Sequence, residues 1–231
     1  MPMLLLTNDD GYDAPGIAAL WRATEGLGDR LMVAPRVGHS GCGHLVTTHQ
    51  RIGVERLGDG RVVVDGSPCD CVRLGLHRLA TGTEWVVSGI NAGGNLGSDV
   101  YVSGTVAAVR EGVIHGLPGI AVSHYLARGR AVDWDAAARR TARVVGDLLS
   151  RPWRPATFWN VNLPHLEPGA PEPEVVECPL DPSPLPLHYE WGEDDASARY
   201  GGDYHGRARV PGSDVDVCFS GRIAVTRVAV S

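Results

Sequence analysis

Short runs of apolar residues alternate with segments of helical periodicity along most of this chain. Residues 3–7 and 30–35 form continuous apolar runs, which are typical of strands buried on both faces of a parallel sheet. Between these runs, Ile17 and Leu20 fall at helical spacing, and Pro15 stands where the first turn of a helix tolerates proline. The chain therefore opens with a predicted strand, helix and strand.

The same alternation continues to about residue 165. Two β-rich runs at 52–57 and 62–65 predict a hairpin. Further strands are predicted at 85–90, 119–123 and 158–163, and helices at 68–79, 105–115 and 133–149. Strands that alternate with helices are joined by right-handed crossovers. We therefore predict an α/β fold with a doubly wound, mostly parallel sheet and helices on both faces, in which ligands bind beyond the carboxyl ends of the strands.

The composition and periodicity of the sequence change at Pro164. Eight prolines fall between residues 164 and 186, and no helical periodicity accompanies them. Long segments without regular structure often act as lids or interaction elements, so residues 178–211 are predicted to form an extended hairpin or loop excursion that protrudes as an arm or lid. A last strand is predicted at 223–230. A chain of 231 residues can be accommodated in one domain, 1–231.

Composition excludes several classes of protein. The formal net charge of -6 argues against a nucleic acid polymer or a membrane as partner, because both favour basic surfaces. Every basic residue is arginine, which rules out a Schiff-base or P-loop lysine. Five cysteines without a C-x-x-C pair form a poor disulfide framework. With neither a basic leader nor an apolar run of ~18 residues, we expect a cytoplasmic protein.

Two adjacent carboxylates, Asp9 and Asp10, directly follow the first predicted strand. Like charges this close repel each other, and a hard divalent cation relieves the repulsion while both groups stay ionised. The alternative is that Asp10 and Gly11 form a turn and that Asn8 or Asp9 caps it. The pair therefore predicts either a metal site or a tight turn.

Two glycine-rich loops also follow predicted strands. In the first, Ser40 could offer a neutral oxygen to a metal or could form a simple turn with Gly41. The second contains Asn91 and Asn95 and leads to Ser103 at a predicted helix start. Backbone N–H groups at a helix amino terminus bind phosphate well, although Ser103 could serve only as a helix cap.

By the logic of the fold, these three loops converge on one edge of the sheet. The predicted metal ligands all carry side-chain oxygens and are Asp9, Asp10, Ser40 and Asn91. Such a set suits Mg²⁺, Mn²⁺ or Ca²⁺ better than a structural zinc. The residues predicted to face a phosphate group are Asn95, Ser103 and Thr105.

The sequence also resembles the survival protein E (SurE) family of acid phosphatases and nucleotidases. The resemblance rests on blocks in family order at residues 5–11 with 14–17, 33–35 with 40–41, 87–91 with 93 and 95, 103–108, and later 160–164. It implies a Rossmann-like domain that hydrolyses nucleoside 5′- and 3′-monophosphates, in some members also polyphosphate. It further implies one divalent cation per subunit, Mg²⁺ or Mn²⁺ with Ca²⁺ possible in a crystal, and a homodimer or homotetramer.

The resemblance assigns roles residue by residue. The implied metal ligands are Asp9, Asp10, Ser40 and Asn91. The predicted catalytic residues are Asp9, Asp10 and Asn95, and the chemistry of the site favours Asp9 as the base or water-orienting group. The implied phosphate contacts are Asn8, Asn95, Ser103, Gly104 and Thr105.

Other interpretations stay open. The same phosphatase chemistry could act on a phosphorylated small metabolite, or the chain could be a non-catalytic nucleotide-binding module. A simple anion site gains nothing from two carboxylates, which argues against the module. His39, His44 and His49 match no zinc spacing, and we expect His44 and His49 to be ordinary exposed or structural residues. The acidic pair at 194–195 is predicted to lie in a solvated loop.

Overall fold

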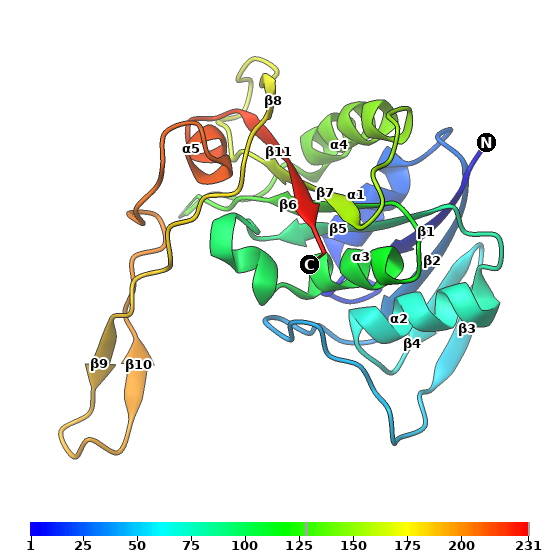
Figure 1. Cartoon of the computed structure of the whole chain (residues 1–231), viewed down its shortest axis with the longest axis horizontal. Helices are drawn as coiled ribbons and strands as arrows, with labels where there is room; N and C mark the ends of the chain where they lie inside the picture. Colours follow the sequence, from blue (N-terminus) through cyan, green and yellow to red (C-terminus); the bar gives the residue numbers. More distant parts are fainter. Residues whose placement is uncertain (128, 231) are drawn as a thin grey trace.

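The structure is a computed structural model that describes residues 1–127 and 129–230. Within these residues a nine-stranded sheet of order β3-β4-β2-β1-β5-β6-β7-β11-β8 forms the centre of the molecule (Figure 1). Its strands are β1 (Met3–Thr7), β2 (Asp29–Pro35), β3 (Val54–Gly58), β4 (Arg61–Val64), β5 (Trp85–Ala92), β6 (Gly119–His124), β7 (Thr157–Leu163), β8 (Val175–Glu177) and β11 (Ile223–Ala229).

The sheet is mostly parallel, as predicted. Strands β4, β2, β1, β5, β6 and β7 pair in parallel with their neighbours, whereas β3 runs antiparallel to β4 and β11 antiparallel to β7. From β1 the chain first builds outward through β2 and β4, and it later returns to add β5, β6 and β7 on the other side. The strand order therefore reverses between β1 and β5, and open α/β sheets bind ligands at such a switch point.

Helices cover both faces of the sheet. They are α1 (Pro15–Ala23), α2 (Pro68–Leu74), α3 (Gly104–Ile114), α4 (Trp134–Leu149) and α5 (Asp214–Phe219), with a 3₁₀ turn η2 (Gly97–Tyr101). Leu4 and Leu6 pack in the core cluster that contains α1 and α4. Leu5 points to the opposite side, into the cluster that contains α2 and α3. Because β1 is buried on both faces, its sequence is apolar without alternation.

One predicted helix differs in its second half. The segment at 68–79 is α-helical only through Leu74 and then widens into a π-helical turn, η1 (Gly75–Leu79). The amide of Ala80 donates to the carbonyl of Gly75 at 2.9 Å, which is the longer i to i+5 spacing of such a turn. Helical periodicity does not distinguish the two kinds of turn over so few residues.

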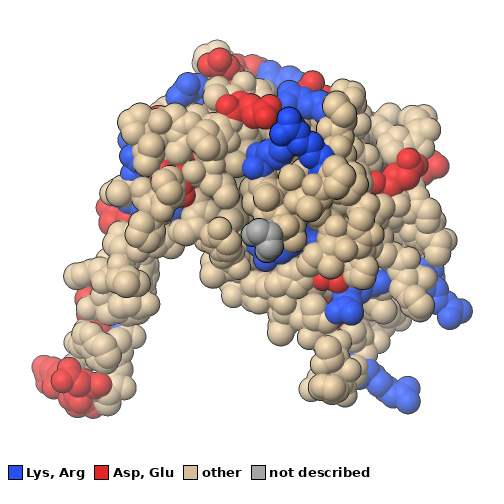
Figure 2. Space-filling view, in the orientation of Figure 1, with Lys and Arg blue, Asp and Glu red and all other residues tan. Residues whose placement is uncertain are grey.

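The excursion at 178–211 contains a small hairpin. Strands β9 (Tyr189–Trp191) and β10 (Ala198–Tyr200) pair antiparallel and protrude from the body of the molecule (Figure 1). Acidic residues gather at the hairpin tip (Figure 2), where Asp194 and Asp195 are exposed, as predicted. The short elements β8 and α5 were not predicted, because three and six residues are too few to show a period. The division into one domain stays a prediction.

Candidate active site

The first part of the site is the end of β1. Asp9 is only 5% exposed, and its carboxylate accepts a short hydrogen bond from the hydroxyl of Thr105. Burial raises the pKa of Asp9 above its ordinary value of 3.8, and the charge of Asp10 raises it further, while the bond from Thr105 opposes both. The carboxylate of Asp10 accepts a hydrogen bond of 3.0 Å from the amide of Ala92 on β5. Asp10 thus bridges the switch point between β1 and β5, and Asp9 is tied to α3.

The loop after β2 lies against this pair. The amide of His39 donates to the carbonyl of Asp9 at 2.7 Å. Gly38 is equally close, because a Cβ atom there would stand 3.3 Å from the carbonyl oxygen of Asp10. Ser40 follows directly and is exposed. The structure therefore brings the loop that carries Ser40 to the predicted edge of the sheet.

The loop after β5 supplies two asparagines. The side-chain amide nitrogen of Asn91 donates to the carbonyl of Gly93 at 2.8 Å, which leaves the amide oxygen as the atom of Asn91 that suits a cation. Asn95 is 7% exposed, and its side chain donates to the hydroxyl of Ser123 at 2.8 Å. Asn95 is therefore held in a fixed orientation from the neighbouring strand β6.

Sequence reasoning assigned no role to the residues that hold Asn95. Its amide donates to Asn162 Oδ1 at 2.8 Å, and its carbonyl accepts from Asn160 Nδ2 at 2.8 Å and Asn162 Nδ2 at 3.0 Å. Both asparagines are fully buried on β7. The block at 160–164 was the available signal, since buried polar side chains on an apolar strand must find hydrogen-bond partners.

The amino terminus of α3 forms the opposite wall. The hydroxyl of Ser103 accepts from the amide of Val106 at 3.1 Å, so the helix-cap interpretation of Ser103 is correct; its O–H can still donate to a ligand. Gly104 packs directly on Asp9, because a Cβ atom there would lie 2.8 Å from Asp9 Cβ and 2.9 Å from Cys42 Sγ. Thr105 is fully buried and uses its hydroxyl to orient Asp9.

Residues at the base of the excursion contact the glycine-rich loop between Asn95 and Ser103. Asp99, on η2, accepts hydrogen bonds from the hydroxyl of Tyr204 at 2.8 Å and from Arg207 Nη1 at 2.9 Å. The side chain of Arg207 is completely buried. Asp214, at the start of α5, accepts from the amide of Gly97 at 2.8 Å. The base of the excursion is therefore part of the wall that holds the loop between Asn95 and Ser103.

The donor set fits a divalent cation. Within residues 1–127 and 129–230, neither Asp9 nor Asp10 forms an ion pair with an arginine or a histidine. The side-chain oxygen of Asn8 is buried without a hydrogen-bond partner. Buried charges are normally paired or bind metal. Carboxylate, amide and hydroxyl oxygens at this edge match the ligands that Mg²⁺, Mn²⁺ and Ca²⁺ prefer.

The fold and the site define a class of protein: a Rossmann-like α/β protein with an acidic, oxygen-rich site at its topological switch point. The model of the family "Survival protein SurE" matches residues 4–178. The chain belongs to this family and is a hydrolase.

Individual relatives match nearly the whole chain. A protein of Nostoc sp. named "Putative 5'-nucleotidase alr3139" is 51% identical over 227 residues, covering 98% of this chain and 99% of that protein. A "5'-nucleotidase SurE" of Allorhizobium ampelinum is 36% identical over 234 residues, covering 96% and 90%. The SurE protein from Aquifex aeolicus, a crystal structure, superposes with a TM-score of 0.87 at 30% identity and covers 99% of this chain and 93% of its own.

No helix among the described residues is both long enough and apolar enough to span a membrane.

Proposed function

We propose that this chain is a divalent-cation-dependent phosphomonoesterase that hydrolyses nucleoside 5′-monophosphates, and also 3′-monophosphates, to nucleoside and phosphate. The observation that carries the proposal is the acidic pair Asp9 and Asp10, which has no basic partner among the described residues and faces the amino terminus of α3. A cation neutralises the pair, and the helix terminus receives a phosphate group.

Four residues would hold the cation: Asp9, Asp10, Ser40 and Asn91. When bound, one Mg²⁺ or Mn²⁺ supplies Lewis-acid stabilisation of the phosphoryl oxygens. Asp9 is placed to orient the attacking water and to accept its proton. The bond from Thr105 fixes which carboxylate oxygen of Asp9 is free.

The phosphate group would contact the opposite wall. The side chain of Asn95 and the hydroxyl of Ser103 offer donors, and the backbone amides of Gly104 and Thr105 add the positive end of the helix dipole. Asn8, fully buried and directly before Asp9, is a further candidate contact. Fixed donors of this kind stabilise the charge that develops on equatorial oxygens during phosphoryl transfer.

A phosphate-release assay tests the proposal. Nucleoside 5′- and 3′-monophosphates, sugar phosphates and polyphosphate are compared, each with EDTA and with Mg²⁺ or Mn²⁺ added back. We expect nucleotide hydrolysis that EDTA abolishes and metal restores. Hydrolysis that persists in EDTA contradicts the metal mechanism, and a preference for sugar phosphates favours the metabolite alternative. Turnover of none of these esters favours a non-catalytic binding module.

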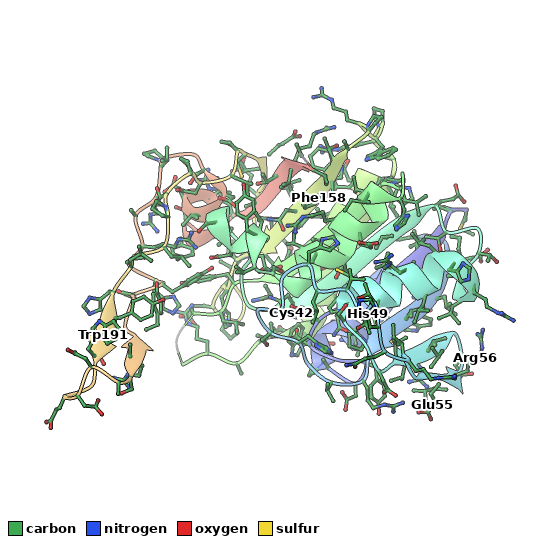
Figure 3. The ribbon with its side chains drawn as sticks, turned by 60° about the horizontal axis from the view of Figure 1, so that its bottom comes forward. Cys42, His49, Glu55, Arg56, Phe158 and Trp191 are labelled. Carbon is green, nitrogen blue, oxygen red and sulfur yellow. The ribbon has the colours of Figure 1, made fainter. Side chains whose placement is uncertain are left out.

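We also propose that the chain assembles as a homodimer or homotetramer in the cytoplasm. The protruding hairpin exposes apolar side chains, with Leu187 91% exposed and Trp191, labelled in Figure 3, 66% exposed. Exposed apolar groups of this kind mark interfaces. Trp191→Asp should lower the molar mass measured by light scattering, whereas Asp194→Asn at the same tip should not. All five cysteines are free thiols, which suits a reducing compartment.

A further inference from the structure

A second group of potential ligands lies outside the all-oxygen site. It comprises His44 from the loop after β2, Cys69 on α2 and Glu111 on α3, and their ligand atoms all lie within 4.8 Å of one another. Cys69 is fully buried and Glu111 is 4% exposed, whereas His44 is half-buried and opens to solvent. Three segments distant in sequence thus place a nitrogen, a sulfur and an oxygen together.

The spacing of these atoms suits a tetrahedral cation. Metal–ligand distances of roughly 2.0–2.3 Å imply ligand atoms about 3.5 Å apart around zinc. His44 Nε2 and Glu111 Oε2 lie 2.6 Å apart, and every pair of ligand atoms lies within 4.8 Å, so the cluster has about the size that a zinc ion requires. Side-chain rotations that move His44 Nε2 and Glu111 Oε2 apart by about 1 Å bring this pair to the separation found around zinc.

The surroundings of Glu111 also fit a metal ligand. Its second oxygen, Oε1, lies 2.9 Å from His115 Nε2 and 3.6 Å from Arg73 Nε. Metal-binding carboxylates are usually held by such outer hydrogen bonds, which fix the ligand orientation. An ion pair between His44 and Glu111 alone would explain these two residues, but it needs no thiol. The buried sulfur of Cys69 beside both is explained by a ligand that takes sulfur.

We propose that His44, Cys69 and Glu111 bind a thiophilic divalent cation of the zinc class, with water in the fourth position. Nitrogen and sulfur donors select such ions over Mg²⁺ and Ca²⁺. Two protons leave to solvent as the cation binds: the thiol proton of Cys69 and the proton that His44 Nε2 and Glu111 Oε2 share, because all three atoms must present lone pairs. This site shares no ligand with the all-oxygen site and does not depend on the proposed phosphatase activity.

The site also has a structural consequence. His44 stands on the loop that carries Cys42 and His49 and crosses this face of the molecule beside α2 and α3 (Figure 3). Asp70 of α2 already accepts hydrogen bonds from the amide and hydroxyl of Thr47, at 2.9 and 2.7 Å. A bound ion would add a second attachment and tie the loop to both helices.

Titration with Co²⁺ tests the proposal, because a cobalt–thiolate bond gives a near-ultraviolet charge-transfer band that an all-oxygen site cannot give. The wild type is expected to show the band at one equivalent. The band should disappear in Cys69→Ser. In His44→Gln the apparent affinity for Co²⁺ should fall at least about 10-fold. It should persist in the matched thiol control Cys178→Ser and in Asp9→Asn.

Two outcomes overturn the proposal: no band in the wild type, or a band retained in full by Cys69→Ser. Thermal unfolding supplies a second readout, since Zn²⁺ at about 100 times its Kd should raise the wild-type midpoint by ~5 °C and leave Cys69→Ser unchanged. If Cys69→Ser does not unfold cooperatively in EDTA, the half-exposed His44→Gln takes its place in both measurements. An unshifted wild-type midpoint also counts against the site.

Discussion

Replacing Asp9 by asparagine should stabilise the metal-free protein while removing its activity. Asp9 is 5% exposed, stands beside a second carboxylate, and has a raised pKa whose main cause is burial. Asparagine keeps the shape of the side chain and can still accept the hydrogen bond from Thr105. The substitution therefore removes one buried negative charge and little else.

The size of the effect follows from the charges. Like charges at the outer end of the ~4–6 Å range over which neighbouring groups shift each other's pKa repel by about 3 kcal/mol at an effective dielectric constant of about 20. Weakening the charge-assisted bond from Thr105 returns about 1 kcal/mol of that gain. A net gain of about 1–2 kcal/mol corresponds to a rise of roughly 2–8 °C in the unfolding midpoint for a chain of this length.

The sign of the pH dependence is also fixed. Because folding raises the pKa of Asp9 above 3.8, the folded state binds this proton more tightly than the unfolded state. The charge of Asp9 therefore costs stability fully at neutral pH, and the cost disappears as pH falls through the raised pKa towards 3.8. The advantage of Asp9→Asn should accordingly be largest near pH 7 and should shrink in acid.

The assay is thermal unfolding in EDTA and again in Mg²⁺ or Mn²⁺, combined with phosphate release. In EDTA, Asp9→Asn should unfold at a higher temperature than the wild type, and added metal should stabilise only the wild type. The kcat/KM of Asp9→Asn should fall at least about 100-fold below that of the wild type. Asp13→Asn, an exposed acid of the same loop, is the control and should change neither quantity. A variant that is less stable than the wild type in EDTA would refute the reasoning.

Two further substitutions test the walls of the site. Gly104→Ala places a Cβ atom 2.8 Å from Asp9 Cβ. The overpacking, about 1–3 kcal/mol, should lower kcat/KM by about 10–100-fold. The control Gly146→Ala, where a Cβ atom meets nothing closer than 3.5 Å, should keep full activity. Arg207→Met leaves Asp99 buried without its guanidinium partner. The free energy of unfolding measured by urea titration should fall by about 3 kcal/mol, and KM should rise. An unchanged urea midpoint would contradict a stabilising role for this ion pair.

Most of the fold could be predicted because its signals are local. The run through Leu4, Leu5 and Leu6 is apolar without alternation because β1 lies between two layers of helices. That pattern, repeated along the chain, specifies a parallel sheet. A parallel sheet in turn places the ends of β1, β2 and β5 at one edge, so the sequence alone predicts that the loops carrying Asp9 and Ser40 lie side by side.

The contacts that complete the site could not be predicted in the same way. Arg207 and Asp99 are 108 residues apart, and His44 and Glu111 are 67 apart. Neither pair belongs to a period or a local motif, so only the tertiary structure reveals it. His44 was expected to be an ordinary or structural residue, and the ion pair with Glu111 is a structural role. Its proximity to Cys69 had no signal in the spacing of the histidines.

The two proposed cation sites share their framework although they share no ligand. Ser40 and His44 lie on one loop, and Thr105 and Glu111 lie on one helix, α3. An ion at the second site would restrain the same loop and helix that position Asp9, because packed elements move as units. The two ions should therefore bind with a coupling free energy, and by linkage each should change the affinity of the other by the same factor. Comparing Mg²⁺ affinity in the wild type and Cys69→Ser, with and without Zn²⁺, measures that factor, and equal affinities in all four states would show that the sites are independent.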